Sequence, residues 1–488
     1  METFLKQVAH DLYYKENGDF TNIAVVFPNK RACLFFNEYL AQESNRPIWS
    51  PTYISISELF RELSDLEIGD PIKLVCDLYK IFCQQTESKE TLDDFYFWGE
   101  MLIADFDDAD KNLVPTKVLF NNLKDLNALT DDYDFLDEEQ KKTLARFFQN
   151  FFINQPTELK KRFMMLWDSL GNIYTNYRKL LESQNIAYEG MLYRNVIETL
   201  NVETLPYKRY VFVGFNVLNK VEHALFSSLY KAGKARFYWD YDIFYTNKHL
   251  HEAGEFILRN LQDFPSELPA SCFDNLSHPK NITLIESPTE NGQARYLPQW
   301  IRQNLTIPEK ETAVVLCNEA LLQPVLHSLP ENIKHINITM GFPLSQTPAY
   351  SFINTLLALH TSGYNAQNKR FRFSEVISVL KHPYTRILSS QTEGLIQTLT
   401  KNNRFYPLPS ELQLDEILSL IFTPCTCNLD LCEKLSHALR NVAILYRQKE
   451  IASDDTSEQL YREGLFQTYT LINRFHTLIE ENELTIQT

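Results

Sequence analysis

Hydrophobic residues along this chain occur in two kinds of segment, short apolar runs and long stretches with helical spacing. The first run, Ile23–Phe27, is uninterrupted and rich in β-branched residues, which predicts a buried strand. Pro28-Asn29 interrupts the run, Lys30-Arg31 adds two cations, and Ala32–Leu40 shows helical spacing. The pattern predicts a strand–turn–helix unit with positive charge at the carboxyl end of the strand, where open α/β sheets bind ligands.

The chain around this unit alternates between β-like and helical patterns. Met1–Leu12 predicts an amphipathic helix, Pro51–Ile56 a short strand, and Ser57 the N-cap of a helix that reaches Leu63. From about Ile72 to Ile197 the pattern is amphipathic with almost no strand signal, which predicts an inserted helical subdomain. Its clearest helices are Lys73–Gln85, Phe95–Asp105, Leu159–Ser183, and Gln140–Phe152, for which Asp137 is the expected N-cap and Gln140 the capping-box partner.

Strand signals return after the helical block. Tyr210–Val213, ended by Gly214, and Ala235–Trp239 predict two strands joined by a helix over Lys220–Ala232. The remaining elements are helices at His251–Asn260 and Gly292–Asn304, strands at Asn281–Ile285, Thr312–Cys317 and Ile336–Thr339, and helices from Pro348 to Thr488. This order indicates two α/β domains, each interrupted by a helical subdomain.

Length and composition narrow the class of protein. The 488 residues suggest about two to four domains, and the low count of 13 glycines favours long helices. A net charge of −16 argues against a generally basic nucleic-acid coat, but it is compatible with basic groups that line one channel. Met1–Tyr14 does not have the pattern of a secretory signal, and no stretch of the sequence approaches the eighteen uninterrupted apolar residues of a membrane-spanning helix. We therefore expect a cytoplasmic protein with free thiols.

Three segments carry a family resemblance. The first, VVFPNKRACLFF, is similar to the motif that follows the Walker A helix in superfamily 1 helicases. The second is YVFVGFNVLNKVEHALFSSLYKAGKARFYWDYDIFY, and the third joins TAVVLCNEALLQPVLHSLP to INITMGFPLSQTPAYSFINTLLAL. Together they resemble the AddB-like proteins, helicase-related subunits of bacterial recombination exonucleases, and among them the Bacteroidetes-type PD-(D/E)XK nuclease family.

The resemblance implies an α/β fold of two P-loop-NTPase-like (superfamily 1 helicase-like) domains, each with a helical insertion, and a mostly helical chain overall. The first domain would comprise residues 1–70 and 201–280, separated by a helical insertion at 71–200. The second, incomplete domain would comprise residues 281–360, followed by a second helical insertion at 361–488. In the family the nuclease domain lies further C-terminal. We therefore expect that domain and its magnesium beyond residue 488, and no cofactor in this chain.

The residues that ATP hydrolysis requires are missing from the pattern. A phosphate-binding loop needs glycines, a lysine and a Ser/Thr hydroxyl, whereas Ala232–Ala235 (AGKA) lacks the first glycine and the hydroxyl. When the chain is aligned with the helicase motif, the carboxylates that bind magnesium would fall at Val213 and Gly214, neither of which carries a carboxylate. At the next positions of the motif, Asn216, Asn219 and Glu222 are polar but do not restore the magnesium site. We predict no ATPase activity and no catalytic residue in this chain.

A PD-(D/E)XK nuclease site cannot be located either. It needs an Asp on one strand and an acid-x-Lys tripeptide on the next, so that two carboxylates hold a metal beside a lysine. The tripeptide occurs in polar helical or loop stretches, where it is common by chance: Glu87-Ser88-Lys89, Glu139-Gln140-Lys141 and Glu158-Leu159-Lys160.

Four further groups of residues have both a chemical and a structural interpretation. Asp240-Tyr241-Asp242 follows a strand and has the D-x-D form with which glycosyltransferases hold a metal-bound nucleotide sugar; the alternative is a pair of solvent-facing carboxylates.

The chemical interpretation of Cys425, Cys427 and Cys432 is part of a metal site, but their spacing fits no strong zinc pattern. We expect a charged turn at Asp105, Asp107, Asp108 and Asp110, after a helix that ends near Ala104. We expect Phe95–Trp98 to pack in a core rather than stack on bases, and we give the isolated His335 and His382 no catalytic role.

By the resemblance, Asn29, Lys30 and Arg31 lie where a helicase-like domain contacts the DNA backbone, although a solvated turn has the same composition. The leading hypothesis is a non-hydrolytic, DNA-binding scaffold of an AddB-like recombination and repair exonuclease subunit. Its partners would be DNA and an AddA-type helicase–nuclease subunit, with no membrane. The alternatives are a two-domain nucleotide-sugar enzyme that uses Asp240 and Asp242, and a helical interaction scaffold without nucleic-acid binding, which the charge of −16 would suit.

Overall fold

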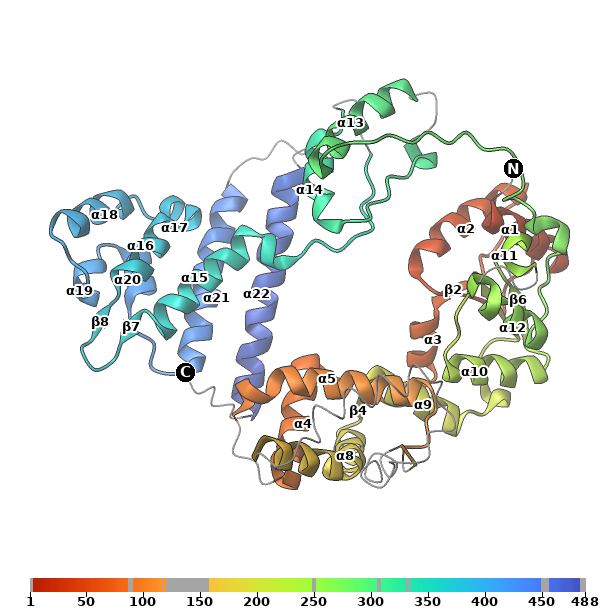
Figure 1. The fold of residues 1–488 in the computed structure, drawn as a ribbon, viewed down its shortest axis with the longest axis horizontal. Helices are drawn as coiled ribbons and strands as arrows, with labels where there is room; N and C mark the ends of the chain where they lie inside the picture. The colour runs from red at the N-terminus through yellow and green to blue at the C-terminus, as the bar shows by residue number, and fades with distance from the viewer. Residues whose placement is uncertain are drawn as a thin grey trace. The chain divides into compact units, whose positions relative to one another are not determined.

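The computed structural model describes residues 3–86, 91–116, 118–119, 158–247, 252–304, 309–330, 333, 335–448 and 456–482. These residues are mostly helical and contain a small parallel sheet (Figure 1). The chain divides into two compact units, Met1–Lys280 and Asn281–Thr488. The sequence expectation of a mostly helical protein with a parallel sheet is therefore confirmed at this level.

The first unit is built on a four-stranded sheet in the order β2-β1-β5-β6, with all strands parallel. The strands are β1 (Ile23–Phe27), β2 (Thr52–Ser55), β5 (Arg209–Val213) and β6 (Ala235–Tyr238). In the register, Val25 lies opposite Tyr53 on one side and Val211 on the other. All five residues of β1 are buried, as expected for a strand covered on both faces.

Helices cover both faces of this sheet because side chains alternate along each strand. Val25 and Phe27 face a core shared with α1 (Phe4–Lys15) and α2 (Lys30–Glu43). Ala24 and Val26 face the opposite core. That second core also contains residues of α3 (Ile56–Glu62), α10 (Lys220–Lys231) and α12 (Glu255–Asp263), with the short α11 (Ile243–Thr246) preceding α12.

A helical block lies between β2 and β5 in the sequence and joins this second core. Its described helices are α4 (Pro71–Thr86), α5 (Leu92–Lys111), α8 (Glu158–Ser183) and α9 (Glu189–Thr199), with β3 (Glu67–Ile68) paired in parallel to β4 (Ile186–Ala187). The helices predicted at Lys73–Gln85, Phe95–Asp105 and Leu159–Ser183 are confirmed, each with somewhat wider bounds. The predicted helix Gln140–Phe152, with its cap residues Asp137 and Gln140, lies outside the described residues.

The second unit is almost entirely helical in its described residues. It contains α13 (Glu290–Gln303), α14 (Leu322–Ser328), α15 (Pro348–Thr361), α16 (Phe373–Lys381), α17 (Pro383–Leu388), α18 (Thr392–Lys401), α19 (Pro409–Leu412), α20 (Glu416–Phe422), α21 (Asn428–Gln448) and α22 (Thr456–Asn482). A short antiparallel hairpin, β7 (Tyr364–Asn365) and β8 (Arg370–Phe371), interrupts the run that was expected to be wholly helical. A hydrophobic core of residues from α15 to α22 holds the helices of residues 348–482 together.

The predicted strands Asn281–Ile285, Thr312–Cys317 and Ile336–Thr339 do not form strands in the structure, although all their residues are described. Leu284 and Val315 are 92% and 83% exposed. Apolar, β-branched composition favours extended backbone, but a strand exists only where a neighbour completes its hydrogen-bonded ladder. The described part of residues 281–360 holds no such ladder, so the prediction of strands was wrong there.

Candidate functional site at the carboxyl edge of the sheet

The topology of the sheet singles out one position at its carboxyl edge. The chain passes from β1 to β2 in one direction across the sheet, and from β5 to β6 in the opposite direction. Ligands of open parallel sheets bind where the order reverses, outside the carboxyl ends of the two adjacent strands. Here that position lies beyond Phe27 of β1 and Val213 of β5. The Asn29-Lys30-Arg31 segment follows β1 directly, so the topology places it at the reversal point.

The three residues predicted to bind DNA have different environments. The side chain of Asn29 accepts a hydrogen bond from the backbone N–H of Ala32 over 3.2 Å and so forms the N-cap of α2. The side chain of Lys30 is 76% exposed and forms an ion pair with Glu58. Arg31 is half-buried at the start of the same helix. Asn29 therefore has a structural role, and Lys30 presents its ammonium group to solvent.

Glu58 belongs to this site, and sequence reasoning missed it. Its carboxylate accepts the backbone N–H of Ser55 over 3.0 Å, while Ser55 Oγ accepts the N–H of Glu58, which completes a capping box at the start of α3. The N-cap is thus Ser55 and not Ser57 as predicted. The S-x-x-E spacing of a capping box was the sequence signal for it. The ammonium of Lys30 and the hydrogen bonds from Ser55 lower the pKa of Glu58 to about 2.

The carboxyl edge of the sheet lacks the glycine-rich loop and the carboxylates that bind a nucleoside triphosphate and its magnesium. The β1–α2 turn contains Pro28 and Asn29 but no glycine, so it offers no glycine-rich backbone cradle. β5 ends at Val213, and Gly214 follows with a φ of 74°. The polar residues Asn219 and Glu222 form a second capping box at the start of α10. Their side chains are therefore engaged with the local backbone.

The D-x-D segment follows β6 at this edge of the sheet. Asp242 accepts three backbone N–H groups, from Phe244 over 2.9 Å and from Asn275 and Leu276 over 2.8 Å each. Burial raises the pKa of Asp242, but these hydrogen bonds outweigh it and the pKa is lowered overall. Burial raises the pKa of Asp240. Asp242 therefore anchors the loop at residues 275–276, and a metal ion there would have to compete with backbone donors.

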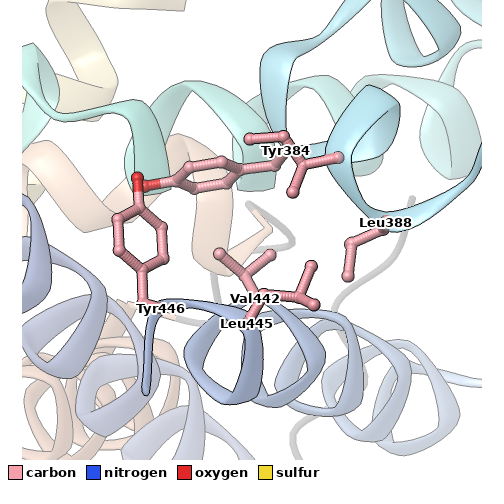
Figure 2. Close-up of a pocket in the computed structure, with 6 residues that line it drawn as sticks. Tyr384, Leu388, Val442, Leu445 and Tyr446 are labelled. Carbon is pink, nitrogen blue, oxygen red and sulfur yellow. The ribbon is translucent and has the colours of Figure 1, made fainter. Parts of the chain in front are cut away.

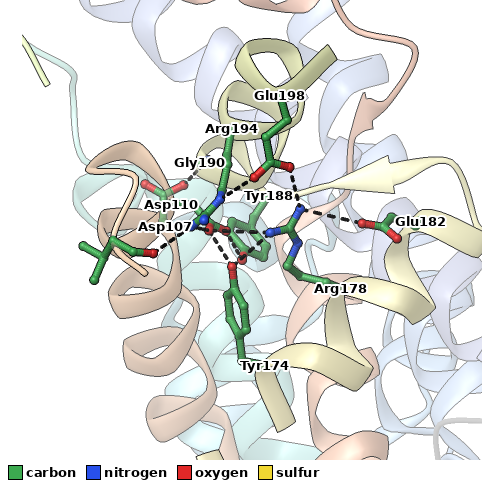
Figure 3. A network of polar contacts seen from close by, with 10 residues as sticks. Asp107, Asp110, Tyr174, Arg178, Glu182, Tyr188, Gly190, Arg194 and Glu198 are labelled. Atoms are coloured by element: carbon green, nitrogen blue, oxygen red, sulfur yellow. Dashed lines mark hydrogen bonds and ion pairs between the residues drawn. The ribbon is translucent and has the colours of Figure 1, made fainter. Parts of the chain in front are cut away.

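The acidic cluster at the end of α5 is a structural network and not the charged turn that was predicted. α5 continues to Lys111, beyond the expected end near Ala104. Asp110 is fully buried and accepts hydrogen bonds from the phenols of Tyr174 and Tyr188 over 2.5 Å each and from Arg194 over 3.1 Å (Figure 3). Aspartates are tolerated inside this helix because hydroxyl, amide and guanidinium donors from α8 and α9 satisfy them. In the same way, Asp107 accepts the backbone N–H of Gly190, while Asp105 and Asp108 are exposed.

The cysteines and histidines singled out from the sequence lie in the second unit. Cys425 lies 3.7 Å from the ammonium of Lys434, and burial raises the pKa of its thiol to about 11. Cys427 accepts the backbone N–H of Asp430, and Cys432 is buried. In the described residues no group of three or more His, Cys, Asp or Glu side chains is arranged to hold a metal ion.

His382 has a structural role, because its ring accepts the backbone N–H of Tyr384 and caps α17. His335 is exposed. Figure 2 shows the small cavity between α17 and α21, lined by Tyr384, Leu388 and residues of α21. It leaves about 10 Å³ for the centre of a water molecule, which is near the minimum for one water and far below the size of a ligand pocket.

The nuclease tripeptides are not brought to this site. Glu87-Ser88-Lys89 and Glu139-Gln140-Lys141 lie outside the described residues, and Glu158-Leu159-Lys160 forms the first turn of α8. Comparison with protein-family models and with curated proteins finds no match to the chain. In the described residues no helix combines the length and the apolar character that a membrane crossing requires.

Proposed function

We propose that this chain is a helicase-like, non-hydrolytic DNA-binding scaffold of an AddB-like recombination and repair exonuclease subunit. The observation that carries the proposal is the position of Lys30 and Arg31 at the carboxyl end of β1, where the strand order reverses between β1 and β5. In this proposal Lys30 and Arg31 contact the phosphates of DNA, and Asn29 fixes the start of α2 behind them.

The ion pair between Lys30 and Glu58 is compatible with this role. In this proposal a DNA phosphate replaces Glu58 as the anion beside Lys30, while the capping hydrogen bonds with Ser55 continue to hold the Glu58 carboxylate. Binding of phosphates by the two cations releases counterions, which makes the affinity depend on salt. The proposal therefore predicts DNA binding that is strongest at low ionic strength.

The absence of hydrolytic groups at the edge supports a binding role over an ATPase role. Val213 and Gly214 stand where carboxylates for magnesium would be needed, and the β1–α2 turn has no glycine. In this proposal the chain works with an AddA-type partner subunit, and the protein acts in the cytoplasm.

The finer fold assignment, two superfamily 1 helicase-like domains, is part of the same proposal. One contact in the second unit bears on it. Asn318 donates hydrogen bonds to both carboxylate oxygens of Glu290 over 3.1 and 3.2 Å. Glu290 begins α13 and Asn318 directly follows Thr312–Cys317, so this contact ties the end of that apolar segment to the start of α13, although the segment forms no strand.

Filter binding to single- and double-stranded oligonucleotides across a salt series tests the proposal. We expect Lys30→Glu with Arg31→Glu to abolish binding at low salt, or to reduce the slope of log affinity against log salt concentration by the amount that about two phosphate contacts contribute. The matched control is Lys208→Glu with Lys231→Glu, which reverses two exposed cations at the opposite edge of the same sheet, before β5 and at the end of α10, and should leave binding close to wild type. Absence of binding by the wild-type protein at low salt, or full binding by the Lys30 and Arg31 variant, would contradict the proposal.

A further inference from the structure

The outer face of α5 exposes large apolar side chains. Phe97, Trp98 and Met101 are 65%, 57% and 44% exposed. The neighbouring Phe95 is buried against the rings of Tyr79 and Phe82, so the expectation that the whole aromatic run packs in a core is correct for Phe95 and wrong for Phe97 and Trp98. The rings of Phe97 and Trp98 lie edge to face with centroids 6.0 Å apart. They form one apolar patch with Met101, which we call the α5 patch.

Carboxylates surround the α5 patch. The exposed acidic residues of α5 are Asp93, Asp94, Glu100, Asp105 and Asp108, and its single basic residue, Lys111, is paired with Asp107 and Glu189. Among the described residues, no salt bridge joins Asp105 or Asp108 to a lysine or arginine. Burial raises the pKa of Asp105, and the negative charge of the adjacent Asp108 raises it further. A cation placed opposite them would relieve this repulsion.

The spacing of the exposed residues along α5 suits a partner helix laid parallel to it. Asp94, Phe97, Met101, Asp105 and Asp108 follow the spacing of one helical face over a length of about 21 Å. Large aromatic residues with an acidic rim have the composition of an interface core and its polar border. The complementary surface is an apolar stripe flanked by lysine or arginine, as on a basic amphipathic helix.

Charge excludes two other occupants. Nucleic acid would bring phosphates against five carboxylates, although aromatic side chains alone can stack on bases. A second copy of this chain, docked symmetrically through the same face, would place carboxylates against carboxylates. We propose that the α5 patch with its acidic rim is the docking site for a basic amphipathic helix of a partner protein. This site is separate from the carboxyl edge of the sheet, so its test does not depend on DNA binding.

A labelled model helix tests the proposal on the full chain. The probe is a fluorescein-labelled peptide of about 18 residues, made of leucine and lysine with the leucines on one helical face. The comparison peptide has the same composition in scrambled order and therefore the same charge without an apolar stripe. By fluorescence anisotropy at about 0.15 M salt, where long-range charge effects are screened, we expect the amphipathic peptide to bind at least about tenfold more tightly than the scrambled one.

Variants assign the binding to α5. Phe97→Ala with Trp98→Ala should weaken binding of the amphipathic peptide at least about tenfold, and so should Asp105→Lys with Asp108→Lys. The matched control, Leu34→Ala with Trp49→Ala, removes apolar side chains that are 72% and 85% exposed elsewhere in the first unit and should bind as wild type. Equal binding of the two peptides, or wild-type binding by the Phe97 and Trp98 variant, would overturn the proposal.

Two further measurements separate the proposal from misfolding and from self-association. In the wild-type protein, a photoreactive group on the amphipathic peptide should cross-link to residues 93–108, and cross-links confined to other regions would contradict the assignment. Sedimentation should show the same oligomeric state for the wild type and for the Phe97 and Trp98 variant. If the wild type forms a dimer that this variant loses, the patch is an interface between copies and the proposed partner is wrong.

Discussion

Tyr188 donates its phenolic hydrogen to Oδ2 of Asp110 over 2.5 Å, which joins the residue preceding α9 to the C-terminal turn of α5 (Figure 3). Asp110 has no exposed surface, and its other carboxylate oxygen accepts hydrogen bonds from Tyr174 and Arg194. One buried carboxylate therefore connects three helices, α5, α8 and α9, of the block that packs against the sheet. Its partners come from positions more than 60 residues further along the chain.

Replacement of Asp110 by Asn should strongly destabilise the first unit. The amide cannot accept all three donors, and a buried donor left without a partner typically costs about 1–3 kcal/mol. Chemical denaturation followed by circular dichroism measures this loss. Asp108→Asn, an exposed site on the same helix, should change the free energy of unfolding by less than about 0.5 kcal/mol. Equal effects of the two substitutions would show that the network is not stabilising.

Gly190→Ala should also destabilise this region, for a steric reason. A Cβ at Gly190 would lie 2.3 Å from the backbone oxygen of Asp107, so α5 and α9 would have to separate, at a cost of about 1–3 kcal/mol. Gly394 is a matched helical glycine on α18 with no heavy atom within 4 Å of a Cβ. Gly394→Ala should therefore stabilise the protein by up to about 1 kcal/mol, because alanine favours the helix. Thermal denaturation of both variants should shift the midpoint in opposite directions, and a stabilising Gly190→Ala would refute the close approach of the helices.

The capping contacts of Glu58 should make stability depend on pH in an acidic window. Its folded pKa of about 2 lies below the ordinary value of 4.5, so the carboxylate stabilises the fold fully above about pH 4.5. That contribution is lost as the pH falls toward 2, when the folded state must also take up the proton. The difference in melting temperature between the wild type and Glu58→Gln should therefore be largest above pH 4.5 and shrink below it. Lys30→Met should reduce this difference, since the ammonium is the largest cause of the shift; a difference independent of pH would argue against the ion pair.

Asp242→Ala should release the loop at residues 275–276 without affecting any metal-dependent activity. The substitution removes the acceptor of three backbone N–H groups, those of Phe244, Asn275 and Leu276. Hydrogen exchange should therefore become faster at these amides. Asp240→Ala, two residues away, should leave the same amides protected. Manganese-dependent binding of a nucleotide sugar by the wild type, lost in both variants, would instead favour the D-x-D interpretation.

Local pattern was sufficient for much of the first unit. The uninterrupted apolar run Ile23–Phe27 predicted β1, and the break at Pro28-Asn29 followed by helical spacing predicted a helix after it, because burial on both faces leaves a direct mark in the sequence. The helix was expected from Ala32, whereas α2 begins at Lys30 with Asn29 as its N-cap. The same reasoning placed β5 and β6 with an intervening helix. Strand order, parallel pairing and the reversal between β1 and β5 depend on contacts between residues about 190 positions apart, which no local pattern contains.

The sequence by itself determined where helices and buried strands form in the first unit, that cations follow β1, and that a glycine-rich phosphate loop is missing from the chain. Only the tertiary structure decided whether each polar side chain is buried and which group it contacts. Asp110 is a buried junction while Asp108 is exposed, and Asp242 holds a loop. It also decided that apolar segments such as Asn281–Ile285 form no strand, since a β-ladder needs a partner strand. The physical reason is common to all three: burial, hydrogen-bond partners and strand pairing belong to groups far apart in the sequence, and composition at one position does not specify which group will meet it.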